Sequence, residues 1–169
     1  MKKKVLSVVA AAALVASLTV PAWAAVASPY GGAEAEGGDV TYTTQAQTGE
    51  DSQATQVYET IQGAESTEQE LGLLGDGLAE TVQAELGATS VNEYRAREIC
   101  SVAVSGEGAT TVTLSNLAGV SAGTEGFVMY LGTDGLWHYL SVSFGNRTAT
   151  FTVPYSTTVI LYVRVAAAA

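Results

Sequence analysis

The stretch Thr148-Ala149-Thr150-Phe151-Thr152-Val153 decides the fold class of this chain. Three threonines alternate with alanine, phenylalanine and valine, so that one face of the stretch carries hydroxyl groups and the other is apolar. This period of two residues is typical of a half-buried β-strand, because successive side chains in a strand point to opposite faces. Gly145-Asn146 precedes the stretch and Pro154 follows it, and both favour turns. The stretch therefore predicts a strand that has one face in a core.

Similar runs continue through the C-terminal half of the chain. Apolar or alternating segments separated by turn residues predict five more strands, at residues 99–104, 111–114, 127–131, 136–144 and 159–165. Six strands with short connections favour an antiparallel sandwich or a small barrel. We therefore expect a mainly β protein, with an antiparallel β-sandwich of about six strands at residues 98–169.

A helical segment at residues 56–97 is predicted to precede the sandwich and to pack on it. Within this segment, two capping-box pairs, Ser66–Gln69 and Thr67–Glu70, mark the start of one amphipathic helix, and Gly87 marks its end. Three glycines inside this helix each cost about 1 kcal/mol relative to alanine, so the helix needs its apolar stripe to be buried. The stripe consists of residues at three- and four-residue steps, Leu71, Leu74, Leu78, Val82 and Leu86.

The region at residues 25–55 is rich in glycine and in acidic residues. Large apolar side chains are scarce here, and every charge has the same sign. Such a composition does not offset the entropy cost of ordering a backbone. We therefore predict a flexible acidic linker at residues 25–55.

The N-terminal 24 residues have the three parts of a secretory signal peptide. Lys2-Lys3-Lys4 is a basic start, residues 5–20 are uncharged, and Ala22-Trp23-Ala24 supplies the small residues of a cleavage site. The uncharged run would span only about 24 Å as a helix, whereas a hydrocarbon core is roughly 30 Å thick. We therefore predict a secreted, extracellular protein that is cleaved near Ala24 and has no stable membrane insertion afterwards.

The chain that remains after cleavage is strongly acidic. Residues 25–169 contain four arginines, no lysine and 17 acidic residues, which gives a formal charge of −13. A field of this sign repels nucleic acid and anionic membranes. We therefore expect no nucleic-acid partner, and an extracellular protein or glycan as the partner instead.

The residue types that carry catalysis are sparse. The chain has one histidine, His138, and one cysteine, Cys100. Cys100 shares its predicted strand face with Val102 and Val104, which favours a buried thiol over a nucleophile, although an intermolecular disulfide stays open. No Gly-rich phosphate loop, zinc motif or calcium loop occurs in the sequence. We therefore expect a protein that is not an enzyme and that has no cofactor and no metal site.

Aromatic residues are the best candidates for recognition. Trp137, Tyr139 and Tyr162, together with Tyr130 and Tyr155, lie in the predicted sandwich. Flat rings exposed on one face would bind sugars by stacking, whereas a single tryptophan in a small sandwich is more often part of the core. The alternative function is therefore a small carbohydrate-binding module that uses Trp137, Tyr139 and Tyr162.

The order of short motifs resembles that of a known family. A T-V-T-L strand leads to Gly119-Val120-Ser121-Ala122-Gly123, and Asp134-Gly135-Leu136-Trp137 and the T-x-T-F-T-V strand follow. The stretch 112–163 thus resembles the Ig-like β-sandwich module found in secreted and wall-attached proteins of Gram-positive bacteria. The resemblance implies a sandwich fold and a location at the bacterial surface. The leading expectation for function is a secreted, non-catalytic module of structural or adhesion type.

Overall fold

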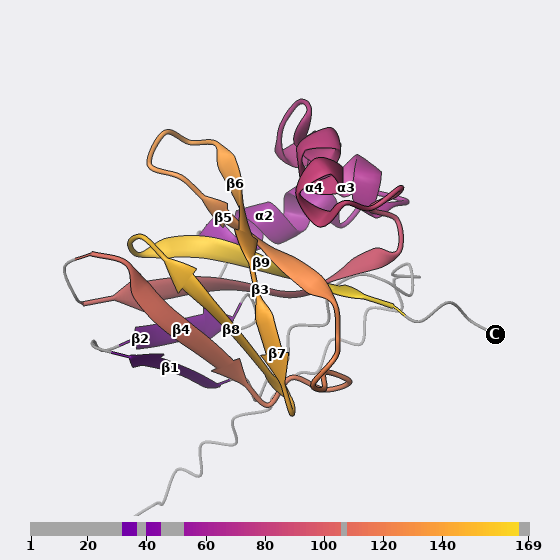
Figure 1. Cartoon of the computed structure of the whole chain (residues 1–169). Helices are drawn as coiled ribbons and strands as arrows, with labels where there is room; N and C mark the ends of the chain where they lie inside the picture. The colour runs from indigo at the N-terminus through magenta and orange to yellow at the C-terminus, as the bar shows by residue number, and fades with distance from the viewer. Residues whose placement is uncertain (1–31, 37–39, 45–52, 106–107, 166–169) are drawn as a thin grey trace, which may run out of the picture.

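The computed structural model describes residues 32–36, 40–44, 53–105 and 108–165 (Figure 1). The predicted signal peptide, at residues 1–24, lies outside these ranges. The described residues form two antiparallel sheets and three helices. The four-stranded sheet has the order β1 (Gly32–Glu36), β4 (Thr110–Ser115), β8 (Thr148–Val153) and β7 (Ser143–Gly145). The five-stranded sheet has the order β2 (Val40–Thr44), β3 (Tyr94–Val104), β9 (Thr157–Arg164), β5 (Gly126–Leu131) and β6 (Trp137–Ser141).

The prediction of a mainly β, antiparallel, sandwich-like protein is confirmed, but the number of strands was underestimated. Each of the six predicted ranges overlaps a strand, and residues 136–144 overlap two of them, β6 and β7. These two strands belong to different sheets, so the chain passes from one sheet to the other at Val142. Such a change of sheet is a common way to form the corner of a sandwich.

The predicted flexible linker at residues 25–55 is wrong for two of its segments. β1 pairs with β4 from Gly32↔Ser115 to Glu36↔Thr111, and β2 pairs with β3 from Val40↔Val104 to Thr44↔Cys100. Each segment adds one strand to the edge of a different sheet. For β1, Gly-Ala-Glu-Ala-Glu, the ladder hydrogen bonds to β4 provide what the composition lacks, because backbone pairing does not require apolar side chains. For β2, Val-Thr-Tyr-Thr-Thr, the residues themselves favour a strand.

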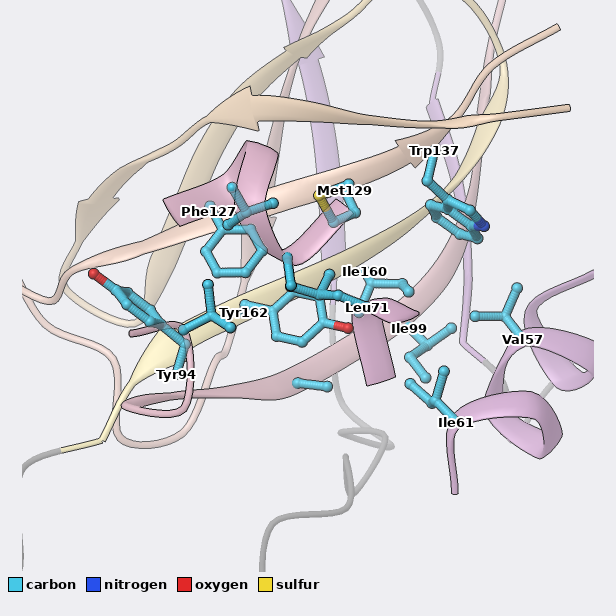
Figure 2. Close-up of a cluster of buried hydrophobic side chains, with 14 of the residues drawn as sticks. Val57, Ile61, Leu71, Tyr94, Ile99, Phe127, Met129, Trp137, Ile160 and Tyr162 are labelled. Atoms are coloured by element: carbon cyan, nitrogen blue, oxygen red, sulfur yellow. The ribbon is translucent and has the colours of Figure 1, made fainter. Parts of the chain in front are cut away.

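The five-stranded sheet is the middle of three layers. One of its faces packs on the four-stranded sheet, through a cluster that includes Val128, Val159 and Leu161 from one sheet and Leu114 and Phe151 from the other. The opposite face packs on the helices, which lie together on one side of the sheet in Figure 1. Figure 2 shows this second cluster, in which helical side chains meet rings from the sheet. Because both its faces are covered, β9 is buried continuously from Thr158 to Val163.

The helical layer contains three helices, α2 (Gln53–Ile61), α3 (Thr67–Leu74) and α4 (Leu78–Leu86). The single long amphipathic helix that we predicted is therefore divided, and the break falls at residues 75–77, where Gly77 has a φ of 75°. Ser66 caps α3, since its hydroxyl accepts a hydrogen bond from the Gln69 amide. Gly87 ends α4 in the left-handed conformation that the sequence predicts for a stop.

The outer face of the four-stranded sheet is lined with threonines, as the alternating stretch predicts. Ala149, Phe151 and Val153 of β8 are buried in the core between the sheets. On the other face, the hydroxyl oxygens of Thr113 and Thr150 lie 2.9 Å apart, and a second Thr pair crosses the same two strands at 3.2 Å. Cross-strand pairs of this kind stabilise a sheet without covering its surface.

Candidate functional site

The three aromatic residues proposed for sugar stacking do not form an exposed surface. Trp137 is 8% exposed and Tyr162 is fully buried, and both belong to the cluster beneath the helices. Tyr139 is half-buried and packs against the same cluster. Trp137 and Tyr139 are two residues apart on β6, so their side chains lie on the same face of the strand. That face packs against the helical layer. A carbohydrate site built on Trp137, Tyr139 and Tyr162 therefore has no exposed surface.

Tyr162 instead belongs to a buried polar contact beneath α3. Its ring stacks on Phe127 with centroids 4.6 Å apart and planes 9° from parallel. Its hydroxyl faces the carboxyl group of Glu70, a side chain that is only 1% exposed. Burial raises the pKa of Glu70 from 4.5 to about 7, while Tyr162 and Arg95 act in the opposite direction. The carboxyl group of Glu70 thus keeps its proton at pH values where an exposed glutamate has lost it.

Cys100 lies in the core and away from solvent. Cys100 is a free thiol in the core between the sheets, and its predicted burial is confirmed. Burial raises its pKa well above the usual value, and the charge of Glu98 acts in the same direction. A thiol of this kind is protonated and inaccessible, and it does not reach a second chain while the domain is folded.

A partly exposed group of functional side chains lies around the β5–β6 hairpin. We call it the hairpin cluster, and it consists of Tyr130, Asp134, His138 and Tyr155. Tyr130 and His138 are directly opposite each other in the β5–β6 register, so their side chains share one face. This face is opposite to the one that carries Trp137 and Tyr139, because neighbouring residues in a strand alternate.

The hairpin turn holds Asp134 against His138. The Leu136 amide donates to Asp134 Oδ1 at 3.0 Å, and His138 Nε2 lies 3.1 Å from each carboxylate oxygen. The Leu136 hydrogen bond and the His138 contact lower the pKa of Asp134. Gly132 leaves room for this pair, since a Cβ atom there would lie 2.3 Å from Asp134 Oδ1 and 2.6 Å from His138 Nε2 and would displace them.

Two tyrosines complete the hairpin cluster. The Tyr130 ring lies 5.2 Å from the His138 ring, tilted by 31°, and meets the Tyr155 ring edge-on at 6.2 Å. Tyr155 follows β8, and its hydroxyl oxygen accepts a hydrogen bond of 2.9 Å from the Thr133 amide. This bond joins the β5–β6 turn to the β8–β9 connection. Burial raises the pKa of Tyr130, with smaller contributions from Tyr155 and Asp134.

A second candidate is an open groove of about 660 Å³ near the C-terminal end of β9. Its main charged group, Arg164, forms ion pairs with Glu93 and Glu125. These two carboxylates raise the pKa of Arg164, with Glu125 contributing most. Arg95 also lines the groove, and its guanidinium donates to the carbonyl oxygens of Asn92 and Tyr94. The arginines are already engaged in holding the loops around β9, which disfavours a role in binding an anion.

The residues described here offer few positions for a metal ion. No group of three or more histidine, cysteine, aspartate and glutamate side chains converges among them. Asp134 and His138 form only a pair, which is fewer ligands than a structural zinc or calcium site uses. In the part of the chain that the structure covers, no helix is both long and apolar enough to cross a bilayer.

Sequence reasoning overlooked the hairpin cluster. It placed Asp134 in a turn and His138 on a strand, but it did not bring them together with Tyr130 and Tyr155. One signal was available, because the Asp-Gly turn lies between two strand runs and implies a hairpin that pairs residues before and after it.

The fold and its sites thus define a two-sheet β-sandwich that is covered on one face by helices. Comparisons of the chain with protein-family models, with curated proteins and with solved structures find no significant match.

Proposed function

We propose that this chain is a secreted, non-catalytic module of structural or adhesion type, and that its contact surface is the hairpin cluster. The observation that carries the proposal is the partly exposed group of ring, carboxylate and imidazole side chains at the β5–β6 turn. The side chains of Asp134 and His138 are 49% and 41% exposed, respectively. Beside them, Leu136 at the turn is 62% exposed. Amphipathic side chains on a rigid turn suit recognition of an extracellular partner.

The layered architecture supports a contact at this position. Helices cover one face of the five-stranded sheet, and the four-stranded sheet covers the other. The large rings on these faces are used for stability, and a partner cannot reach them without opening the core. Loops and turns at the ends of a sandwich remain for recognition, as in many sandwich folds.

The electrostatics of the titratable groups support a non-catalytic role. A nucleophilic cysteine needs a lowered pKa, and burial has the opposite effect on Cys100. Glu70 does have a perturbed pKa, but its carboxyl group is enclosed beneath α3. General acid–base catalysis requires such a group to contact the substrate.

The test of the function is an adhesion assay with a matched pair of variants. Labelled protein is incubated with Gram-positive cell walls and with a panel of immobilised extracellular proteins. We expect retention on at least one of these surfaces and a loss of at least tenfold in Leu136→Ala with His138→Ala. Leu73→Ala, which truncates an exposed leucine on α3, is the control and should bind normally.

Two results would contradict the proposal. The first is the absence of binding to every surface in the panel. The second is turnover of wall, ester, peptide or glycoside substrates by the purified protein. Secretion is tested separately by expression in a Gram-positive host, where the protein should accumulate in the medium with a new N-terminus near Ala25.

A further inference from the structure

The hairpin cluster has the composition of a site for one chemical class of ligand. Its tyrosine and histidine rings offer apolar faces, while Asp134 and the tyrosine hydroxyls offer polar groups next to them. A pyranose sugar has the same division, with C–H groups on the faces of the ring and hydroxyl groups around its edge. The rings of Tyr130 and Tyr155 meet at 68°, so they do not form one flat plane.

Hydrogen-bonding capacity remains within the cluster. A carboxylate has about four acceptor sites. The Leu136 amide and His138 Nε2 use some of those on Asp134, and the others are available to ligand hydroxyls. The Tyr155 oxygen accepts from the Thr133 amide, which leaves the Tyr155 hydrogen to donate. The cluster thus presents both an acceptor and a donor, the combination that a sugar hydroxyl needs.

Charge selects among the possible ligands. The charged groups that act on Tyr130 and Asp134 are the carboxylate of Asp134 and the imidazole of His138. A carboxylate at the centre disfavours phosphate, sulfate and carboxylate ligands, and the formal charge of the chain has the same sign. An uncharged, hydroxyl-rich ligand fits this environment better than an acidic one.

The cluster is also preorganised. Gly132 N donates to Leu136 O at 2.7 Å, and Gly135 N donates to Gly132 O at 3.0 Å, so the turn is fixed by its own backbone. The Thr133–Tyr155 hydrogen bond connects the turn to a second loop. A site that is rigid before binding loses less entropy on binding, which matters for ligands as polar and as small as sugars.

We propose that the hairpin cluster binds a neutral sugar of an extracellular glycan. The rings of Tyr155 and His138 contact the C–H face of the sugar, and Asp134 accepts hydrogen bonds from its hydroxyls. This inference rests on the proposed adhesion function, because it names the ligand class of the same surface. It differs from a site at Trp137, Tyr139 and Tyr162, which are directed into the core.

The experiment uses the purified protein on an array of neutral and acidic glycans, followed by calorimetric titration of the best neutral binder. Asp134→Asn keeps the shape of the side chain and removes its charge, and Tyr155→Ala removes a ring. Each should lower affinity at least tenfold. The controls are Glu80→Gln, which removes an exposed carboxylate from α4, and Leu73→Ala, and both should bind as the unmodified protein does. Thermal unfolding of each variant shows whether it is folded.

The outcomes separate the glycan inference from the adhesion function. Binding of neutral glycans that is lost in Asp134→Asn and in Tyr155→Ala supports the inference. Binding that survives both variants, a preference for acidic glycans, or no glycan binding at all overturns it. If glycans do not bind but adhesion to an immobilised protein is lost in Leu136→Ala with His138→Ala, then the adhesion function stands with a protein partner. If both assays are negative, both proposals fail.

Discussion

Glu70 should make the stability of this protein depend on pH, and Glu70→Gln should remove that dependence. The carboxyl group lies at the interface of α3 with the five-stranded sheet, next to the Tyr162 hydroxyl of β9 and the Arg95 guanidinium of β3. Burial raises its pKa from 4.5 to about 7. A raised pKa in an acid means that the folded state holds its proton when the unfolded state has already lost it.

The sign and the size of the effect of Glu70 on stability follow from the difference between its pKa in the folded and in the unfolded state. Below pH 4.5 the carboxyl group is protonated in both states, so its ionisation does not change the free energy of unfolding. Between pH 4.5 and about 7 only the unfolded state ionises, and stability falls by about 1.4 kcal/mol for each pH unit. Above pH 7 both states are ionised and the penalty is constant. Linkage therefore predicts that Glu70 lowers stability by about 2.5 kcal/mol between pH 5 and pH 8.

Urea unfolding at a series of pH values from 5 to 8.5 measures this effect. The stability of Glu70→Gln relative to the unmodified protein should rise by about 2.5 kcal/mol across this range. Glu80→Gln removes a carboxylate that is exposed on α4, and its relative stability should stay level. Since other groups titrate equally in both proteins, their contributions cancel in the difference. A difference between Glu70→Gln and the unmodified protein that does not change with pH would refute a protonated, buried Glu70.

Other predictions concern packing, the thiol and the hairpin. Leu71→Ala removes a fully buried side chain of α3 and should cost about 2–5 kcal/mol by urea unfolding, whereas Leu73→Ala at an exposed position of the same helix should cost less than about 0.5 kcal/mol. Cys100 should react with an aromatic disulfide reagent only after denaturant is added, and rapid labelling of the folded protein would contradict its burial. Gly132→Ala should separate His138 from Asp134, which a change in the histidine NMR signals would reveal, and unchanged signals would count against the close approach at this turn. Gly72→Ala, which has open space around it inside α3, should instead stabilise the protein by about 1 kcal/mol.

The sequence predicted the strands well where one face of the strand meets solvent. The stretch at residues 148–153 alternates because its threonines face outward and its apolar residues face the core. The leucine stripe predicted that a helical segment packs on the sandwich, but not which sheet it covers, although the apolar runs at 127–131 and 159–165 contained a signal for it. A strand that is buried on both faces reads as continuously apolar rather than alternating. Those runs were assigned as strands, but the covering of their second face was not inferred from them.

Strand β6 illustrates the same limit at single residues. Trp137 and Tyr139 lie on one face of β6 and Leu140 lies on the other. Both faces therefore carry large apolar side chains, and the sequence does not show which of them is buried. In the three-layer structure the first pair packs under the helices, while Leu140 packs toward the four-stranded sheet. The edge strand β1 could not be predicted, because its glycine, alanine and acidic residues have low β-propensity and long-range pairing holds it in place. The edge strand β2, Val-Thr-Tyr-Thr-Thr, does have strand-favouring residues, and that signal was overlooked.

The hairpin cluster could be predicted only in part, for a reason of register. An Asp-Gly turn between two apolar runs indicates a hairpin, but a shift of one residue moves every side chain to the opposite face. The observed register places Tyr130 opposite His138. Tyr155 comes from a connection between two other strands, and its position depends on the packing of the whole sandwich. Local sequence patterns contain no information on how close Tyr155 comes to the β5–β6 turn.

The three layers also determine where recognition can occur in this fold. Large rings on a face of the middle sheet are enclosed where the neighbouring layer covers them, as Trp137 and Tyr162 are. The outer face of the four-stranded sheet carries paired threonines, which are polar but lack rings. Tyr130 and Tyr155 are partly exposed beside the β5–β6 turn, where Tyr155 comes from the β8–β9 connection. A binding surface at this end places the exposed polar groups of Asp134 and His138 beside Tyr130, a ring that also packs against the core between the sheets.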